Sequence, residues 1–413
     1  MPRFIPSNRL LSQSQGRLWD ASNDIAYFDF RGNAGPTTTV PTGFGFFRAA
    51  CIDSIQIGTS ELVLIPSAPD VLRYGRADDS WDIGLALEVI RTNTIRDASN
   101  FSGVDFTVVP TVGRFTGEPD PLSPAGTAAT RLTSNALGRL IALRSGLNPA
   151  TAQMVSMWME PTVAGTDIGL NTTGGPAGIT SVSDVVLGAS KIWRRLNAMN
   201  FGSGAGVMRM NAVCGPAMTG LAAGPKDWNG YGVQYEVGEY PTELIPTTGV
   251  AVQRRGTILR ALDATWTPFI RAGRMSIEFS LRPKGSRIEF AADPDIQYLW
   301  HTFANFSAFL DDTGILTLRV PSGATNTCVM PLWARNDLLD LWFQVGGGLP
   351  TVVQYRINGG PTVSLPITGA PLGDVTGNLD LFVVNANSDI GNQFSSWLYG
   401  IGFYKVGQPY WAI

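Results

Sequence analysis

The chain has 413 residues, of which 44% are hydrophobic and 15% are charged, against about 25% charged in a typical globular domain. This length predicts at least two domains, and a net charge of −3 argues against a general affinity for nucleic acid or acidic membranes. The N-terminus has no signal-peptide pattern, and no apolar run approaches the ~20 residues of a membrane helix. We therefore expect a soluble chain without a signal peptide or a membrane insertion.

Residues 1–80 form the first predicted region. Their short apolar stretches are separated by Gly-, Pro- and Thr-rich turns, which predicts a small β region. Residues 3–16 have no periodicity and are rich in Ser, Gln and Arg, as is typical of an arm that becomes ordered by lying on another surface. The expected strands are residues 25–30, 44–50, 52–57 and 62–65.

Residues 81–255 are predicted to fold as a β-sandwich or jelly roll. Turns recur at short intervals, and no stretch keeps the 3.6-residue period of a helix. A glycine-rich segment at residues 199–210 leads into another strand-like stretch, which disfavours a dinucleotide-binding turn. The expected strands are residues 85–91, 105–109, 129–133, 139–143, 153–159, 184–187, 191–196, 207–213 and 231–237.

Residues 256–413 show the clearest alternation of apolar and polar side chains, the pattern of strands with one buried face. Tight hairpin turns are expected at residues 311–314 and at the dipeptide Asn358-Gly359. The pattern therefore predicts a second β-sandwich. The alternating stretches are residues 275–281, 316–320, 339–345 and 353–357.

Three stretches resemble, in the same order, the jelly-roll module of tailed-phage fibre and head-spike proteins. At residues 231–255, a strand carrying Gln, an acidic residue and Gly precedes a segment rich in Pro, Thr and Gly. At residues 84–103, Thr94 and Ile95 stand where the family usually has leucines. The third stretch is residues 121–132. The matching residues of the first two are Gln234, Glu236, Gly238, Pro241, Thr242, Ile245, Pro246, Thr247, Thr248, Gly249, Val252 and Arg254, and Gly84, Leu85, Glu88, Arg91, Thr92 and Asn93.

The last strand-like stretch resembles the closing strand of concanavalin A-like (laminin G-like) sandwiches. It carries Trp397, Tyr399, Ile401 and Phe403, with Gly400 and Gly402 between them. Together the resemblances imply an all-β chain of three successive regions. These are a virion-attachment region at residues 1–80, a jelly-roll domain similar to carbohydrate-binding modules at 81–255, and a concanavalin A-like domain at 256–413.

Residue types that often carry chemistry are scarce. The three cysteines, Cys51, Cys214 and Cys328, lie far apart without metal-ligand spacing, and we expect them to be small buried side chains. His301, the single histidine, lies in an aromatic strand-like stretch. Packing in or beside a core is the favoured interpretation, and a catalytic base is the alternative. We expect no metal and no cofactor.

Glycoside hydrolysis needs two carboxylates about 5–10 Å apart across the sugar, and no predicted strand supplies such a pair. We therefore expect no enzymatic activity, with a glycanase of unfamiliar geometry as the alternative. Asn305, Asp311 and Asp312 could hold calcium, but a plain hairpin turn also accounts for them. The candidate acids stand alone or lie in turns and loops: Glu118, Asp120, Glu278, Glu289, Asp293 and Asp295.

Sugar binding without catalysis needs aromatic faces with hydrogen-bonding groups beside them. The best local grouping is Trp228, Asn229 and Tyr231, at a predicted glycine turn. The alternative, which we favour, is that the two aromatic side chains pack at a strand edge. Other tryptophans within apolar alternations are expected in the core: Trp158, Trp193 and Trp397.

The resemblance implies a structural protein of a bacteriophage or phage-like particle, assembled in the host bacterial cytoplasm. It would attach to capsid or tail proteins through residues 1–80, present its sandwiches to host-surface glycans, and form a homotrimer. One alternative is a capsid-decoration or tail-scaffold protein without a glycan ligand. A second alternative is a glycan depolymerase.

Overall fold

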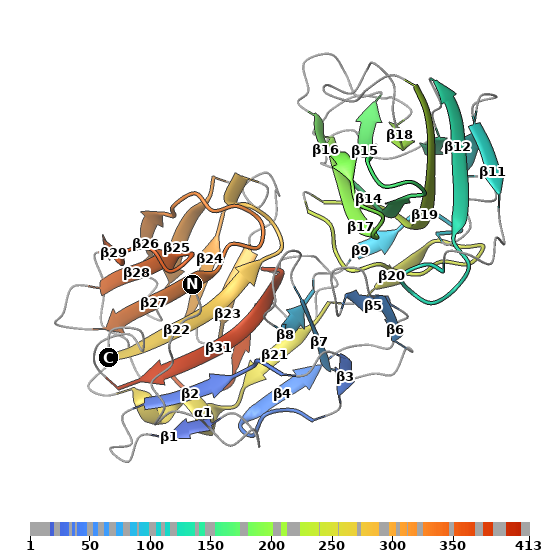
Figure 1. The fold of residues 1–413 in the computed structure, drawn as a ribbon. Helices are drawn as coiled ribbons and strands as arrows, with labels where there is room; N and C mark the ends of the chain where they lie inside the picture. The colour runs from blue at the N-terminus through green and yellow to red at the C-terminus, as the bar shows by residue number, and fades with distance from the viewer. Residues whose placement is uncertain are drawn as a thin grey trace. The chain divides into compact units, whose positions relative to one another are not determined.

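A computed structural model gives the fold of the chain (Figure 1). It describes residues 17–19, 25–32, 35–37, 39–47, 53–56, 62–65, 72–76, 83–88, 91–98, 105–108, 112–115, 122–136, 140–144, 153–173, 181–200, 208–212, 224–238, 240–254, 256–270, 274–288, 297–302, 306–311, 313–319, 325–346, 351–367, 375–382 and 394–405. Most of the described residues are in antiparallel strands, which confirms the predicted all-β sandwich class.

The chain divides into two compact units. Unit 1 comprises Met1–Arg48, Asp70–Val89 and Thr257–Ile413, and unit 2 comprises Ala49–Pro69 and Ile90–Gly256. This division differs from the three successive regions expected from the sequence. The physical reason is that strands from the first 80 residues pair with strands near the C-terminal end, which period-two alternation alone does not reveal.

Unit 1 contains a large sheet that runs in the order β29-β28-β27-β22-β31-β8-β7-β3. One edge of β31 pairs with β22, and the other pairs with β8 and then with β2, which in turn pairs with β1. The bounds are β1 (Arg17–Trp19), β2 (Ile25–Asp29), β3 (Gly35–Thr37), β7 (Leu72–Arg76), β8 (Ile83–Leu87), β22 (Arg274–Pro283), β27 (Leu339–Gly346), β28 (Thr351–Ile357), β29 (Val363–Ile367) and β31 (Ser396–Tyr404).

A small sheet in unit 1 runs in the order β26-β25-β24-β23-β30-β21-β4. After β21 the chain makes a helical turn, α1 (Asp263–Trp266), and a 3-10 turn, η2 (Thr267–Phe269). The bounds of the strands are β4 (Phe44–Phe47), β21 (Ile258–Ala261), β23 (Gln297–His301), β24 (Ser307–Leu310), β25 (Ile315–Arg319), β26 (Thr325–Val329) and β30 (Leu379–Leu381).

Aromatic side chains join the two sheets of unit 1 into a sandwich. Phe279 of β22 stacks on Trp300 of β23 with 5.8 Å between ring centroids, and Trp300 meets Phe343 of β27 edge-on at 4.8 Å. Phe28 of β2 and Phe44 of β4 make a similar edge contact at 4.7 Å. Such pairs contribute about 0.5–1.5 kcal/mol each beyond the area they bury. The N-terminal strands therefore share the core of the C-terminal ones.

Unit 2 is built on a sheet that folds over itself, in the order β10-β13-β18-β15-β16-β17-β14-β19-β12-β11. The first residues of β16 pair with β17, and the rest of β16 pairs with β15. The sheet therefore turns over at β16, which brings β15 to pack against β14 and β19. The bounds are β10 (Phe106–Val108), β11 (Val112–Phe115), β12 (Thr130–Ala136), β13 (Leu140–Arg144), β14 (Gln153–Pro161), β15 (Thr166–Thr173), β16 (Ser181–Ala189), β17 (Arg194–Asn200), β18 (Met208–Ala212) and β19 (Gly224–Val237).

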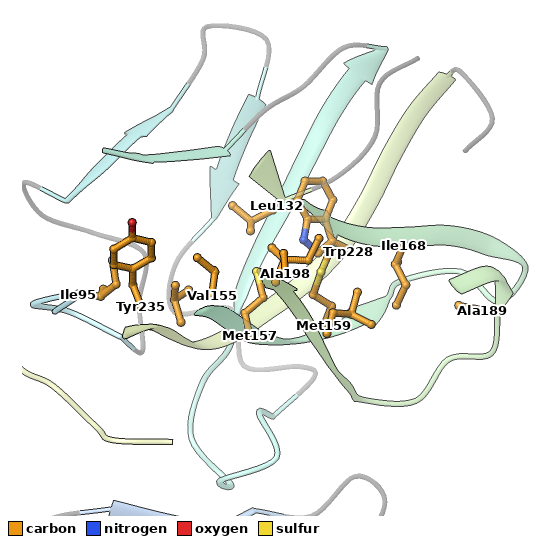
Figure 2. Close-up of a cluster of buried hydrophobic side chains, with 13 residues drawn as sticks. Ile95, Leu132, Val155, Met157, Met159, Ile168, Ala189, Ala198, Trp228 and Tyr235 are labelled. Atoms are coloured by element: carbon orange, nitrogen blue, oxygen red, sulfur yellow. The ribbon is translucent and has the colours of Figure 1, made fainter. Parts of the chain in front are cut away.

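Two short strand pairs complete unit 2: β9 (Arg91–Asn93) with β20 (Val252–Arg254), and β5 (Asp53–Gln56) with β6 (Leu62–Ile65). Figure 2 shows the apolar core of the unit, where side chains of β14, β15 and β19 meet. The cluster consists of Ile95, Leu132, Val155, Met157, Met159, Ile168, Leu170, Ala189, Leu196, Ala198, Trp228, Val233 and Tyr235.

The predicted hairpin turns are confirmed. Asn358 and Gly359 have φ of 52° and 72°, as a tight primed turn requires. Asp311 closes the other turn by accepting hydrogen bonds from the backbone nitrogens of Thr313 and Ile315, at 2.9 and 3.0 Å. The expected arm at residues 3–16 lies outside the described residues.

Candidate functional site

Six polar side chains form a row across the outer face of the small sheet. Directly paired residues in a sheet point to the same face. The neighbours of these residues in sequence, including Trp300 and Leu318, are buried on the opposite face. We call this the polar row, in strand order Arg260, Asp380, His301, Ser307, Arg319 and Thr325.

The row begins with an ion pair. The Arg260 guanidinium donates from Nη2 to Asp380 Oδ2 at 2.9 Å and also donates from Nε to Oδ1. This two-point geometry is the strong form of an arginine–carboxylate contact. The hydrogen bond from Arg260 to Asp380 raises the pKa of Arg260. Both carboxylate oxygens of Asp380 are therefore engaged by its neighbour in the row.

Two aromatic rings lie next to the centre of the row. Tyr298 and Phe309 are paired across β23 and β24, with 5.1 Å between ring centroids, and Tyr298 meets His301 edge-on at 5.7 Å. The guanidinium carbon of Arg319 lies 5.6 Å from the Phe309 ring centroid. Tyr298 is 9% exposed and Phe309 6%. The rings therefore support the polar groups and offer little face of their own to a ligand.

Burial sets the protonation of the central histidine. Desolvation lowers the pKa of His301 below its ordinary value; the charge of Asp380 opposes this effect and that of Arg319 adds to it. Burial also raises the pKa of Tyr298, against a lowering by Arg319. At neutral pH, His301 is therefore a neutral donor and acceptor. The favoured prediction, a histidine beside a core, agrees with its half-buried position.

The order Ser307, His301, Asp380 resembles a nucleophile, a base and an acid, but the surroundings do not suit catalysis. Ser307 is 1% exposed, so its hydroxyl is not accessible to a substrate. Asp380 is engaged by Arg260 and is not free to orient the imidazole alone. The row is better suited to binding than to breaking a bond.

The outer face of the large sheet holds a second polar layer. The Tyr404 hydroxyl donates a hydrogen bond to Glu278, and Tyr27 lies close enough for the Glu278 charge to add to the burial that raises the pKa of Tyr27 well above its ordinary value. Trp342 is paired with Glu278 on the same face. These side chains are at most 6% exposed, so the layer is packed rather than open.

A carboxylate pair on this face corrects the expectation that Glu278 stands alone. Asp340, paired with Ser280, lies on the strand next to Glu278 and on the same face. Asp340 accepts hydrogen bonds from Ser280 at 2.8 Å and from Arg356 at 3.4 Å. The sequence could not reveal the pair because the two acids are on different strands. Both are buried and hydrogen-bonded.

The residues predicted as a sugar platform are buried. Trp228 is 0% exposed, Asn229 1% and Tyr231 3%. Trp228 belongs to the core of unit 2, Tyr231 packs with Trp158 and Trp193, and Asn229 donates to Glu160 at 3.1 Å. A ring must expose a face to stack on a sugar. The structure therefore corrects the grouping: the three residues are near each other but face the interior of unit 2.

Several of the residues that carry the phage resemblance, on β9, β19 and β20, have a structural role. We call residues 240–250 the strap, because they lie on β19 through hydrogen bonds. Gln234 accepts from the Ile245 backbone nitrogen at 2.6 Å, and Asn93 donates to the Ile245 carbonyl at 2.9 Å. Arg254 donates to the Glu243 carbonyl at 3.1 Å. These side chains hold a chain segment in place and are not available to a ligand.

The described residues hold no cluster of His, Cys, Asp or Glu able to bind a metal ion. The Asp311 carboxylate serves its own hairpin turn. Burial raises the pKa of the Cys328 thiol to about 11. Within the described part of the chain, no helix is long and apolar enough to cross a membrane. Several residues considered above lie outside the described residues: Cys51, Cys214, Glu118, Asp120, Glu289, Asp293, Asp295, Asn305 and Asp312.

No family model matches the chain, and no curated protein sequence does. Among solved structures, the N-terminal CBM22-1-CBM22-2 tandem domain of Xyn10C from Paenibacillus barcinonensis is similar over 78% of this chain and 98% of its own. The sequence identity is 9% and the TM-score 0.26. A TM-score this low does not establish a shared fold.

Proposed function

We propose that this chain is a non-enzymatic structural protein of a bacteriophage or phage-like particle, which attaches to capsid or tail proteins and presents its sandwiches to glycans on the host surface. The observation that carries the binding role is the polar row, which extends from a partly buried ion pair at β21 and β30 to the exposed Thr325 on β26. Hydrogen-bonding groups fixed by a rigid sheet are suited to recognising sugar hydroxyls.

The binding role is favoured over catalysis because the acidic side chains on the outer faces of the two sheets already accept hydrogen bonds from neighbouring residues. Asp380 is held by Arg260, Asp340 by Ser280 and Arg356, and Glu278 by Tyr404. A glycanase needs one acid that can donate a proton and a second that can act as base or nucleophile. Carboxylates that already accept hydrogen bonds from cations and hydroxyls meet neither need well.

The particle role is supported by the sequence resemblance. Several of its matching residues, including Gln234, Glu236 and Asn93, act together in unit 2, on the strap and the strand beneath it, whereas those at residues 84–88 lie in unit 1. A shared arrangement of this kind explains why the pattern extends over two distant stretches of sequence. The resemblance also suggests a homotrimer, in which many copies on one particle would turn weak glycan contacts into useful avidity.

The attachment role of residues 1–80 needs a test other than deletion. Strands β2, β3, β4 and β7 belong to unit 1, and β2 and β4 pair with β31 and β21. Deleting the region would remove strands from both sheets of the sandwich and confound attachment with folding. Crosslinking of the intact chain within assembled particles avoids this problem, and the position of residues 1–80 then identifies the attached neighbour.

The glycan role is tested with the full-length chain on a glycan array, with light scattering to count the copies in the oligomer. Selective binding without loss of polysaccharide chain length supports the proposal. Incorporation into particles without binding to any glycan would instead indicate a decoration or scaffold protein. Shortening of the polysaccharide would indicate a depolymerase.

A further inference from the structure

We infer that Arg319, paired with Thr325 at the exposed end of the polar row, binds the carboxylate of an acidic glycan, a chain containing uronic or sialic acid. This inference rests on the proposed glycan-binding function and assigns its site and its ligand class. Three observations support it: Arg319 has no ion-pair partner among the described residues, the threonines beside it are exposed, and the Phe309 ring lies beneath it.

The charge of Arg319 is not neutralised within the described part of the chain. Arg260, at the other end of the row, is paired with Asp380. Arg356, on the large sheet, has a carboxylate partner in Asp340. Arg319 makes no ion pair with any described residue, and its guanidinium carbon lies over the Phe309 ring. An anionic ligand would supply the missing opposite charge.

The ring beneath Arg319 prepares the guanidinium for binding. Phe309 is almost fully buried, and Arg319 lies over it in a cation–π contact. The contact limits the side-chain conformations of Arg319, so less conformational entropy is lost when a ligand binds. Phe309 is therefore a positioning residue. The planar guanidinium can then offer two parallel N–H donors to a planar carboxylate.

The surface beside Arg319 suits sugar hydroxyls. Thr325 is paired with Arg319, and Thr327 with Thr317, so both threonines lie on the same face of the edge strand β26. Both are exposed. A hydroxyl both donates and accepts, as sugar hydroxyls do. A sugar ring placed across β25 and β26 could direct its carboxylate to Arg319 and its hydroxyls to the two threonines.

A single carboxylate suits this site better than a dense polyanion. Arg319 contributes one full charge, and His301 is neutral at neutral pH because its burial disfavours the charged form. The chain as a whole has a net charge of −3. Nucleic acids bind proteins that present many cationic groups together. The arrangement therefore points to a ligand with isolated carboxylates, separated by neutral sugar surface.

The test measures binding of the full-length chain to a galacturonic acid hexasaccharide and to sialyllactose. The methyl ester of the first and lactose serve as uncharged counterparts. Arg319→Gln should weaken binding of both acidic ligands by about tenfold or more, since a hydrogen bond to a charged group contributes that much. Arg319→Lys keeps the charge but loses the two-point geometry, and its affinity should fall between those of wild type and Arg319→Gln.

A second variant leaves Arg319 in place. Thr325→Glu puts a carboxylate opposite Arg319 at an exposed position and should abolish binding of the acidic ligands. Thr39→Glu, an equal change at an exposed residue of unit 1 outside the row, should not alter it. Circular dichroism and thermal unfolding of each variant show whether the fold is kept.

The outcomes separate this inference from the proposed function. If wild type binds neutral glycans as well as acidic ones and Arg319→Gln changes neither, the site and ligand class are wrong while glycan binding stands. If wild type binds acidic glycans but Thr325→Glu and Arg319→Gln do not weaken it, the ligand class stands and the site is wrong. If wild type binds no glycan at all, the proposed function fails, and the inference fails with it.

Discussion

Glu236, with none of its surface exposed, accepts hydrogen bonds from both the backbone nitrogen and the hydroxyl of Thr242, each at 2.8 Å. The pair joins the C-terminal end of β19 to the strap, so this carboxylate has a structural role. Charged acceptors form stronger hydrogen bonds than neutral ones. The first prediction follows from this pair.

Thr242→Val should destabilise unit 2 by about 1–3 kcal/mol, because Glu236 loses a donor while it stays buried. Thr242→Ser keeps the hydroxyl and serves as the matched control, with a smaller loss. Urea unfolding followed by tryptophan fluorescence measures the difference, since several tryptophans of unit 2 are buried. Equal stability of the Val and Ser variants would show that the hydroxyl contact contributes nothing.

The close packing on the outer face of the large sheet gives a second prediction. A Cβ atom on Gly400 would lie 1.9 Å from the Tyr27 hydroxyl oxygen, closer than any contact allows. Gly400→Ala should therefore destabilise unit 1 by about 1–3 kcal/mol or more, as overpacking does. The same substitution should cost less in a Tyr27→Ala background, since the clash is gone. If thermal unfolding shows additive losses, the two residues do not compete for the same space.

The strands themselves were predictable where alternation is strong. Residues 275–281 lie in β22 and residues 339–345 in β27, with their apolar side chains buried, as expected. The partners of these strands were not predictable, because a strand's alternation tells which face is buried and not which strand lies beside it. The pairing of β2 with β31 joins Ile25 to Tyr404 and leaves no local signal in the sequence.

The sugar grouping failed for a related reason. Gly230 was interpreted as a turn, yet it lies within β19 and pairs with Thr130 on one side and Met159 on the other. The strand begins at Gly224, so Trp228 and Tyr231 occupy its middle rather than its edge. The polar row could not be predicted from the sequence, because its residues lie on separate strands and are brought together only by the register of the sheet.

A third prediction concerns pH and uses the chain's single histidine. Burial lowers the pKa of His301 below its ordinary 6.5. The unfolded chain therefore takes up a proton at higher pH than the folded one, so stability from this group is present above the unfolded pKa and is lost as pH falls through 6.5 towards the folded pKa. His301→Gln should reduce this dependence. NMR titration of the imidazole reads the folded pKa directly, and a value at or above 6.5 would contradict the prediction.

A fourth prediction follows from the buried thiol. Burial raises the pKa of Cys328 to about 11, so almost none of it is thiolate at pH 8. Because the thiolate is the reactive form, alkylation by iodoacetamide should be slow in the native protein and fast in urea. Peptide mapping by mass spectrometry follows this residue separately from the other cysteines. Rapid native alkylation would show that the thiol is reached by solvent.

The last prediction concerns a buried ion pair between β8 and the end of β22. Lys284 and Glu88 are in contact with side chains 5% and 3% exposed, and the Lys284 amine lies 3.9 Å from the Trp397 ring centroid. Lys284→Met should cost about 3–5 kcal/mol, because it leaves Glu88 charged and buried. Replacing both, with Lys284→Met and Glu88→Leu, should recover most of that loss, because Glu88 then leaves no unpaired carboxylate at this position.

Chemical denaturation of the wild type, the single variant and the double variant measures this recovery. A double variant less stable than Lys284→Met alone would contradict this, because it would mean that Glu88 stabilises unit 1 even without Lys284. Glu88 is also one of the residues that carry the phage resemblance. Recovery would therefore assign Glu88 a structural role in unit 1, as the buried partner of Lys284.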